Sequence, residues 1–110
     1  MQYEELPAWS AKAAAWAAQY HATLRDRPIR PNVVPGDFLS KIPTEPPQSA
    51  EPFENIFADF VKLVPDSMTH WQHPRFFAYF SSNASPASML AEQLANAISA
   101  QCMLWQTSPA

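Results

Sequence analysis

The placement of proline limits what this chain can fold into. Seven of its 12 prolines fall between residues 26 and 52, while the whole chain contains a single glycine. Proline lacks a backbone N–H and clashes with the preceding helical turn, so this stretch excludes a continuous helix or a central strand. A flexible linker would be richer in glycine and serine. We therefore predict an ordered, extended strap, with a turn at Pro35-Gly36 and one helical turn at residues 37–41.

Helical periodicity flanks the strap on both sides. Over residues 7–25, side chains recurring at steps of 4, 3, 4 and 4 predict one helix that Pro28 stops. Its stripe consists of Trp9, Ala13, Trp16, Tyr20 and Leu24. From Pro52 to the residue before Pro65, apolar side chains at helical spacing predict a second helix, with Pro52 as its first residue.

A third helix is predicted to begin after Ser85. Ser85 suits the N-cap and Pro86 suits the first helical position. One face of this helix is then formed by Leu90, Leu94, Ala97, Ile98 and Gln101. We expect the helix to end near Cys102 and a loop to follow it.

Aromatic residues are numerous for a chain of this size. Four Trp, three Tyr and seven Phe stand beside only 15% charged residues in 110 positions. Residues 76–80 alone hold four aromatics and predict an extended strand buried on both faces. So many large rings are hard to cover in a domain of this length. We expect an apolar face that packs against another chain or a further domain; the alternative is a compact helical domain with a rich core.

Composition also excludes several classes of function. One glycine excludes the Gly-rich phosphate-binding loops, and a net charge of −3 argues against nucleic acid or an anionic membrane as main partner. No segment reaches the roughly 18 apolar residues of a membrane-spanning helix, and no signal segment follows Met1. The single Cys102 excludes an internal disulfide, so we expect a reducing, cytoplasmic location.

Few clusters of residues suggest chemistry. His70 and His73 could form a metal pair, but no Cys, Asp or Glu cluster completes it, so two histidines hydrogen-bonded in a packed turn are favoured. Ser81, Ser82 and Ser85 lack a nucleophile motif and a placed base. The residues alone therefore indicate a helical, partner-dependent module with an aromatic wall, without a metal site or catalytic residues of its own.

Several segments together carry a family resemblance. They are His-Trp-Gln-His-Pro-Arg-Phe-Phe-Ala-Tyr-Phe at 70–80, Ser-Pro-Ala-Ser-Met-Leu at 85–90 and Trp-Gln-Thr-Ser-Pro-Ala at 105–110. Tyr20 and residues 25–35 add a Tyr-x₄-Arg-Asp-x-Pro-Ile-Arg pattern followed by Val-x-Pro-Gly. Taken in the order of the chain, these segments resemble the N-terminal part of the group II pyridoxal-phosphate decarboxylases, the aromatic-L-amino-acid decarboxylase branch.

The resemblance implies a fold and an activity. It implies a mainly α N-terminal arm, about three helices joined by Pro-rich extended segments, of a fold-type-I transferase-like enzyme that uses pyridoxal 5'-phosphate (PLP). Residues 1–84 would form this arm with its strap, and residues 85–110 would begin the large PLP-dependent domain. The complete enzyme would be an intertwined homodimer that removes the carboxylate of an aromatic or related amino acid, with PLP accepting the electrons.

Substrate-contacting residues are also implied only by the resemblance. The set is Trp71, Tyr79, Phe80, Ser81, Ser82, Gln101 and Met103. Ser82 keeps the hydroxyl expected there, whereas Ser81 replaces the usual proline. Gln101 and Met103 stand where aromatic-specific members have an apolar pair that reaches the pocket across the dimer interface. Without the resemblance, plain core packing would be favoured for Trp71, Tyr79 and Phe80.

The family's cofactor lysine lies in an Asn-Pro-His-Lys context that this sequence lacks. Lys12, Lys41 and Lys62 all stand in other settings. We therefore expect an N-terminal fragment that is inactive and binds no cofactor by itself, and that needs a homodimer partner or its own missing catalytic domain. The alternative is a stand-alone helical interaction or dimerisation module without catalysis.

Overall fold

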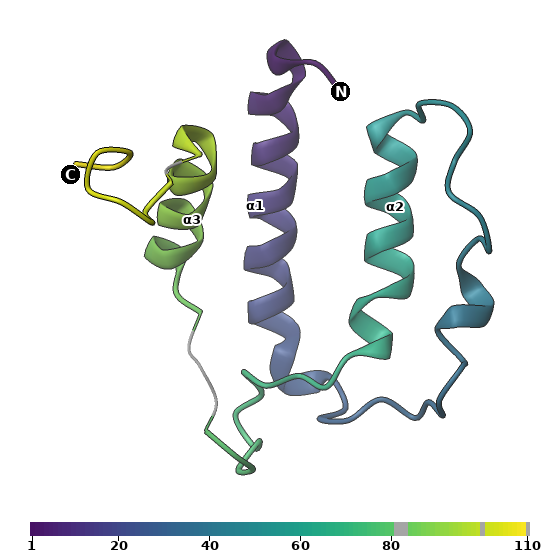
Figure 1. Ribbon diagram of the computed structural model, residues 1–110. Coiled ribbons are helices and arrows are strands. Elements are labelled where there is room, and N and C mark those ends of the chain that lie inside the picture. The colour runs from purple at the N-terminus through teal and green to yellow at the C-terminus, as the bar shows by residue number, and fades with distance from the viewer. Residues whose placement is uncertain (81–83, 100, 110) are drawn as a thin grey trace. The chain divides into compact units, whose positions relative to one another are not determined.

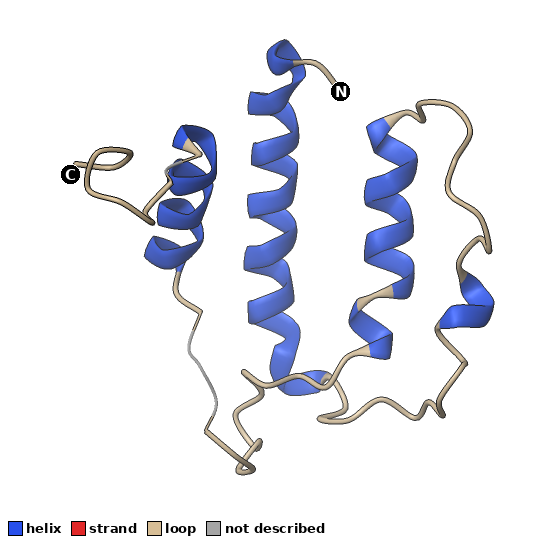
Figure 2. Ribbon diagram, viewed as in Figure 1, coloured by secondary structure: helices blue, strands red, loops and turns tan. Residues whose placement is uncertain are grey.

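The computed structural model describes residues 1–80, 84–99 and 101–109 (Figure 1). The chain divides into two compact units, Met1–Tyr79 and Phe80–Ala110, and each is described by itself. The described residues form helices, turns and loops without a strand (Figure 2). In this part of the chain, no helix is long and apolar enough to cross a membrane.

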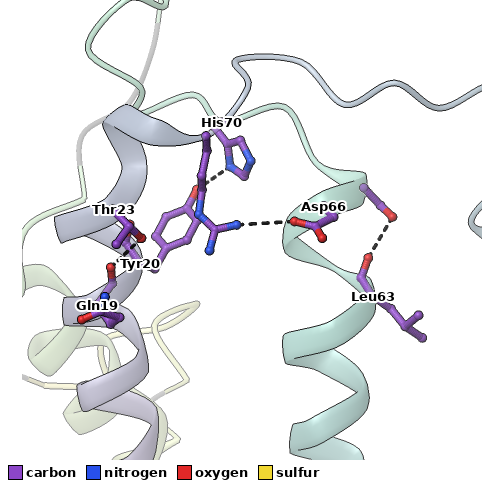
Figure 3. Close-up of polar contacts among 8 residues, drawn as sticks. Gln19, Tyr20, Thr23, Leu63, Asp66 and His70 are labelled. Atoms are coloured by element: carbon purple, nitrogen blue, oxygen red, sulfur yellow. Dashed lines mark hydrogen bonds and ion pairs between the residues drawn. The ribbon is translucent and has the colours of Figure 1, made fainter.

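The first unit begins with a long helix, α1 (Leu6–Thr23), which a 3-10 turn precedes at Tyr3–Glu5 and another follows at Leu24–Asp26. Pro7 lies in its first turn, where its missing N–H has no intrahelical partner to lose. At the other end the Thr23 hydroxyl donates to the Gln19 carbonyl oxygen over 2.9 Å (Figure 3). The helix therefore tightens at about the place where the sequence predicts its end.

The second helix of this unit, α2 (Phe53–Leu63), packs against α1 through aromatic rings. Trp9 lies 5.0 Å from Phe53 and 5.7 Å from Phe57 between ring centroids, and Trp16 lies 5.1 Å from Phe60. The later residue of α1, Trp16, contacts the later residue of α2, Phe60, so the two helices run in the same direction (Figure 1). The predicted apolar stripes of the two helices are thus the faces that meet.

A parallel pair of helices needs a long connection, and the Pro-rich strap supplies it. The 18 residues of α1 rise roughly 27 Å, which the strap must travel back before α2 can start. Its turn has Gly36 at φ 99, a conformation that L side chains rarely adopt, and the Asp37 carboxylate accepts the Val34 N–H over 2.9 Å. The predicted helical turn is the 3-10 turn Leu39–Lys41. Pro52 is the N-cap of α2 and not its first residue as predicted, because its ψ of 132 is not helical; the helix begins one residue later, at Phe53.

Little of the apolar surface is covered. Among the described residues, Leu24 is the one buried large apolar side chain, whereas Tyr3, Phe77, Leu94 and Trp105 are largely exposed. The compact domain with a rich core, which composition left open, is therefore not what the chain forms. The expected under-covered apolar surface is what the structure shows.

The predicted strand at residues 76–80 is wrong. The Phe76 N–H donates to the His73 carbonyl oxygen over 2.9 Å, which makes a turn, and Tyr79 has a left-handed φ of 57. Phe77, Tyr79 and Phe80 are exposed instead of buried on both faces. A strand needs a neighbour to pair its backbone groups, and the described residues offer none.

The second unit contains α3 (Pro86–Ile98) and the turns after it. As predicted, Ser85 is the N-cap and Pro86 the first residue; the Ser85 hydroxyl accepts the Ser88 N–H over 3.1 Å, and the Ser88 hydroxyl accepts the Ser85 N–H over 2.9 Å. Ser99 turns left-handed at φ 50 and ends the helix, so Gln101 is not on its face as predicted. The Gln101 carbonyl oxygen instead accepts the Thr107 hydroxyl over 2.6 Å.

Candidate functional site

The candidate site is the segment from Thr69 to Tyr79, which follows the 3-10 turn Pro65–Ser67 and passes the C-terminal end of α1. The His70 N–H donates to the Ile29 carbonyl oxygen over 3.0 Å, and the His73 N–H donates to the His70 carbonyl oxygen over 3.0 Å. The segment is therefore tied to the residues that follow α1 and closes its own turn.

His70 is the first anchor of this segment. It is 3% exposed, and its Nδ1 lies 2.8 Å from the hydroxyl of Tyr20 in α1 (Figure 3). Burial lowers the pKa of His70, and the Arg27 guanidinium adds to that effect against the opposing pull of Asp66. Burial likewise raises the pKa of Tyr20, which Arg27 partly offsets. The neutral imidazole and the neutral phenol therefore share one hydrogen bond, between Nδ1 and the hydroxyl oxygen.

His73 is the second anchor, and its tautomer follows from its partners. It is 3% exposed; the Arg75 N–H donates to its Nδ1 over 3.0 Å, so the proton lies on Nε2 and is donated to the Arg25 carbonyl oxygen over 3.3 Å. Both ring nitrogens are thus occupied, as expected of a histidine in a packed turn. In the described part of the chain, no three His, Cys, Asp or Glu side chains gather as they would around a metal ion.

Charged groups surround the Tyr20–His70 pair. The Arg27 guanidinium lies over the Tyr20 ring at 5.2 Å from its centroid and reaches Asp66 at 3.5 Å. The Asp66 side chain is 84% exposed, so this ion pair contributes little to stability by itself. Its effect is to hold a positive charge beside the pair, which disfavours an imidazolium at His70.

Between the two anchors, the Trp71 ring faces two other rings. Its centroid lies 5.1 Å from that of Phe76 and 5.8 Å from that of Tyr79, with interplanar angles of 46° and 31°. We call these three rings the aromatic shelf. Trp71 is 44% exposed and Tyr79 more so, which leaves π-faces available to a planar ring. The left-handed backbone of Tyr79 is costly for a bulky residue.

The predicted substrate residues are only partly brought together. Trp71 and Tyr79 share the aromatic shelf, whereas Phe80, Gln101 and Met103 belong to the second unit and are exposed there. Ser81 and Ser82 lie outside the described residues. Their contact with a substrate stays a prediction.

Sequence reasoning missed Phe76 as part of the shelf and missed the Tyr20–His70 pair. A signal for the pair was present: Tyr20 lies on the packed stripe of α1, and a tyrosine hydroxyl that is drawn into a core needs a partner. The later histidines were the available acceptors.

Comparison with known proteins assigns the family. The conserved domain of pyridoxal-dependent decarboxylases matches residues 35–110. Rattus norvegicus histidine decarboxylase is 33% identical over 109 residues, which are 99% of this chain and 17% of that protein. Rattus norvegicus aromatic-L-amino-acid decarboxylase is 40% identical over 95 residues, which are 86% of this chain and 20% of that protein.

A solved structure agrees with this. Oryza sativa TDC, crystallised with PLP and tryptamine, superposes with a TM-score of 0.90 at 29% identity over 99% of this chain and 23% of its own. The chain belongs to the pyridoxal-dependent decarboxylase family. It spans about a fifth of the length of the relatives that it matches.

The residues present do not make a complete site for PLP. Lys12 lies with its Nζ 4.0 Å from the centroid of the Trp9 ring, and Lys41 and Lys62 lie in the last turns of their own helices. None of the three belongs to the segment that carries the aromatic shelf.

Proposed function

We propose that this chain forms the N-terminal part of a PLP-dependent decarboxylase whose substrate is an amino acid with an aromatic or heteroaromatic side chain. The observation that carries the proposal is the aromatic shelf, whose rings stay open while the two histidines that flank Trp71 are buried. A rigid support under exposed rings is what recognition of a planar side chain requires. The histidine and aromatic-L-amino-acid decarboxylases among the relatives are named for substrates with such side chains.

In this proposal PLP and the residues of this chain have different roles. PLP, when bound by the rest of the enzyme, accepts the electron pair that decarboxylation leaves behind. The residues of this chain bind and orient the substrate: Trp71 and Tyr79 contact its ring, together with Phe80, Ser81, Ser82, Gln101 and Met103 of the predicted set. Orientation of this kind is worth several kcal/mol of barrier in enzymes generally.

The proposal extends to assembly and location. The exposed apolar side chains favour a homodimer or a tight contact with the catalytic domain, since a face of this kind is unfavourable in water. Cys102 is free and exposed, which suits the reducing cytoplasm. Light scattering on the chain alone is expected to show self-association at micromolar concentration, and a strict monomer would contradict this part.

A chimera tests the function. In Rattus norvegicus aromatic-L-amino-acid decarboxylase, the segment that aligns with this chain is replaced by this chain, and decarboxylation of aromatic amino acids and of histidine is measured. We expect activity toward at least one of them. Trp71→Ala should raise KM about tenfold by removing the central ring of the shelf, while Trp71→Phe should restore much of the loss.

Met68→Ala is the matched control, because Met68 is an exposed side chain just before the segment and lies outside the shelf. It should leave KM unchanged. A folded chimera that binds PLP but decarboxylates none of these amino acids would refute the function. In that case, self-association of the chain alone would favour the dimerisation module instead.

A further inference from the structure

We infer that His70 is a positioning residue that holds Trp71 in place through its neutral imidazole, so that binding of a ring-bearing substrate weakens in acid before the chemical step is affected. This inference rests on the proposed function, because it assigns a role within the same site. His70 touches no substrate in this view; it acts through Trp71 alone.

Trp71 lies between His70 and His73, which are each held in place by hydrogen bonds. On one side, His70 is held through its backbone by Ile29 and through its ring by Tyr20. On the other side, both ring nitrogens of His73 are engaged, at the Arg25 carbonyl oxygen and at the Arg75 N–H. Trp71 itself is half in water, and its ring contacts those of Phe76 and Tyr79, which are on the same segment. The histidines on either side of Trp71 therefore tie its segment to α1 and to the residues that follow α1.

The surrounding groups make the neutral form of His70 the one that fits. From α1 it meets Tyr20, whose ring in turn contacts His21 at 5.4 Å. Arg27 follows the 3-10 turn after α1 and faces it with a positive charge, Asp66 lies in the turn after α2, and His73 lies on its own segment. Burial, Arg27 and His73 all disfavour the imidazolium, and only the exposed Asp66 favours it.

Protonation changes the role of the atom that makes the contact. Nδ1 of an imidazolium can only donate, so the Tyr20 hydroxyl, which can donate or accept, must then accept from it. A charged ring is unfavourable in this buried place beside Arg27, so it shifts toward water, and Trp71 is the next residue. A group whose pKa is lowered by folding stays neutral above the ordinary 6.5 and charges only as the pH falls through the lowered pKa.

The kinetic test uses the active chimera with four variants. Tyr20→Phe and His70→Leu break the pair and should raise KM for the aromatic substrate roughly fivefold at neutral pH with kcat nearly unchanged. His70→Asn keeps an oxygen in place of Nδ1 but does not titrate, so KM should stay low as the pH falls, while the parent's KM rises. Tyr3→Phe, the same change at a side chain 88% exposed, should match the parent.

A second measurement uses the 110-residue chain without activity. Fluorine NMR of the fluorotryptophan-labelled chain gives a Trp71 resonance, assigned by its loss in Trp71→Phe. In the parent it should move as the pH falls below 6.5. In Tyr20→Phe it should lie near that acid position already at neutral pH, and in Tyr3→Phe it should follow the parent.

The two measurements separate the possible failures. A chimera that folds and binds PLP but is inactive refutes the proposed function and leaves the NMR result to decide on His70. A Trp71 resonance that Tyr20→Phe does not move overturns the positioning role. So does an active chimera in which His70→Asn shows the same acid rise of KM as the parent, or in which the variants lower kcat and leave KM alone.

Discussion

The aromatic pairing of α1 with α2 predicts how strongly one ring supports the first unit. Trp9 contacts both Phe53 and Phe57, and the Lys12 ammonium lies over its ring at 4.0 Å from the centroid. Truncating a fully buried Trp or Phe to Ala costs about 3–5 kcal/mol. Trp9 is only half-buried and its gap would open to water, so we expect Trp9→Ala to cost roughly 2–3 kcal/mol.

This loss is large compared with what the unit has. A unit of 79 residues with one buried large apolar side chain falls at the low end of the usual range, about 4 kcal/mol at roughly 0.05 kcal/mol per residue. With a urea slope of about 1 kcal/mol per molar, the midpoint should fall by about 2 M. Alanine favours a helix more than tryptophan does, so a change in helix propensity cannot cause the drop.

Urea unfolding followed by far-UV circular dichroism measures this change. Trp105→Ala is the matched control, because Trp105 is 75% exposed in the other unit and its loss should cost no more than about 0.5 kcal/mol. If the two alanine variants unfold at the same urea concentration, the ring contacts do not hold α1 to α2 and the parallel pairing is not what stabilises this unit.

Three further outcomes are expected. Because folding lowers the pKa of His70, the unfolded chain binds more protons than the folded chain in acid. The urea midpoint should therefore be highest above pH 6.5, the ordinary pKa of histidine, and should fall as the pH drops through the lowered pKa. His70→Asn should make the midpoint depend less on pH. Ser85→Ala removes the hydroxyl that accepts the Ser88 N–H and should cost α3 about 1 kcal/mol, read as faster amide exchange in α3 with α1 unchanged. Ser99→Gly should slow exchange at the end of α3, because glycine adopts the φ of 50 found there without strain.

The sequence predicts the parts of the fold that depend on neighbouring residues better than the parts that depend on residues far apart in the chain. The helices follow from periodicity and from proline, and the cap at Ser85 follows from local chemistry, so α1, α2 and the start of α3 lie close to their predicted bounds, whereas α3 ends at Ile98 and not near Cys102. The strand at 76–80 was wrong because aromatic residues favour a strand only when a neighbour pairs with it. Whether such a neighbour exists depends on tertiary structure, which four aromatics within five residues do not determine.

The site shows the same division. The family resemblance predicts that Trp71 and Tyr79 contact the substrate, which stays a prediction; the structure places their ring centroids 5.8 Å apart. The pairing of Tyr20 with His70 joins residues 50 positions apart, and no local pattern encodes it. It follows only once the strap has brought the end of α2 back to the end of α1.

The backbone of Tyr79 connects the stability of this chain to its proposed role. A left-handed φ at a bulky residue costs on the order of 1–2 kcal/mol and persists where the surroundings determine it. Within the first unit its ring contacts that of Trp71, and the side chain is largely exposed. One tilted ring pair contributes about 0.5–1.5 kcal/mol, which at most balances the strain. Tyr79 is thus held less firmly than Trp71, and a substrate ring or the remainder of the proposed enzyme would supply the further contact that fixes it.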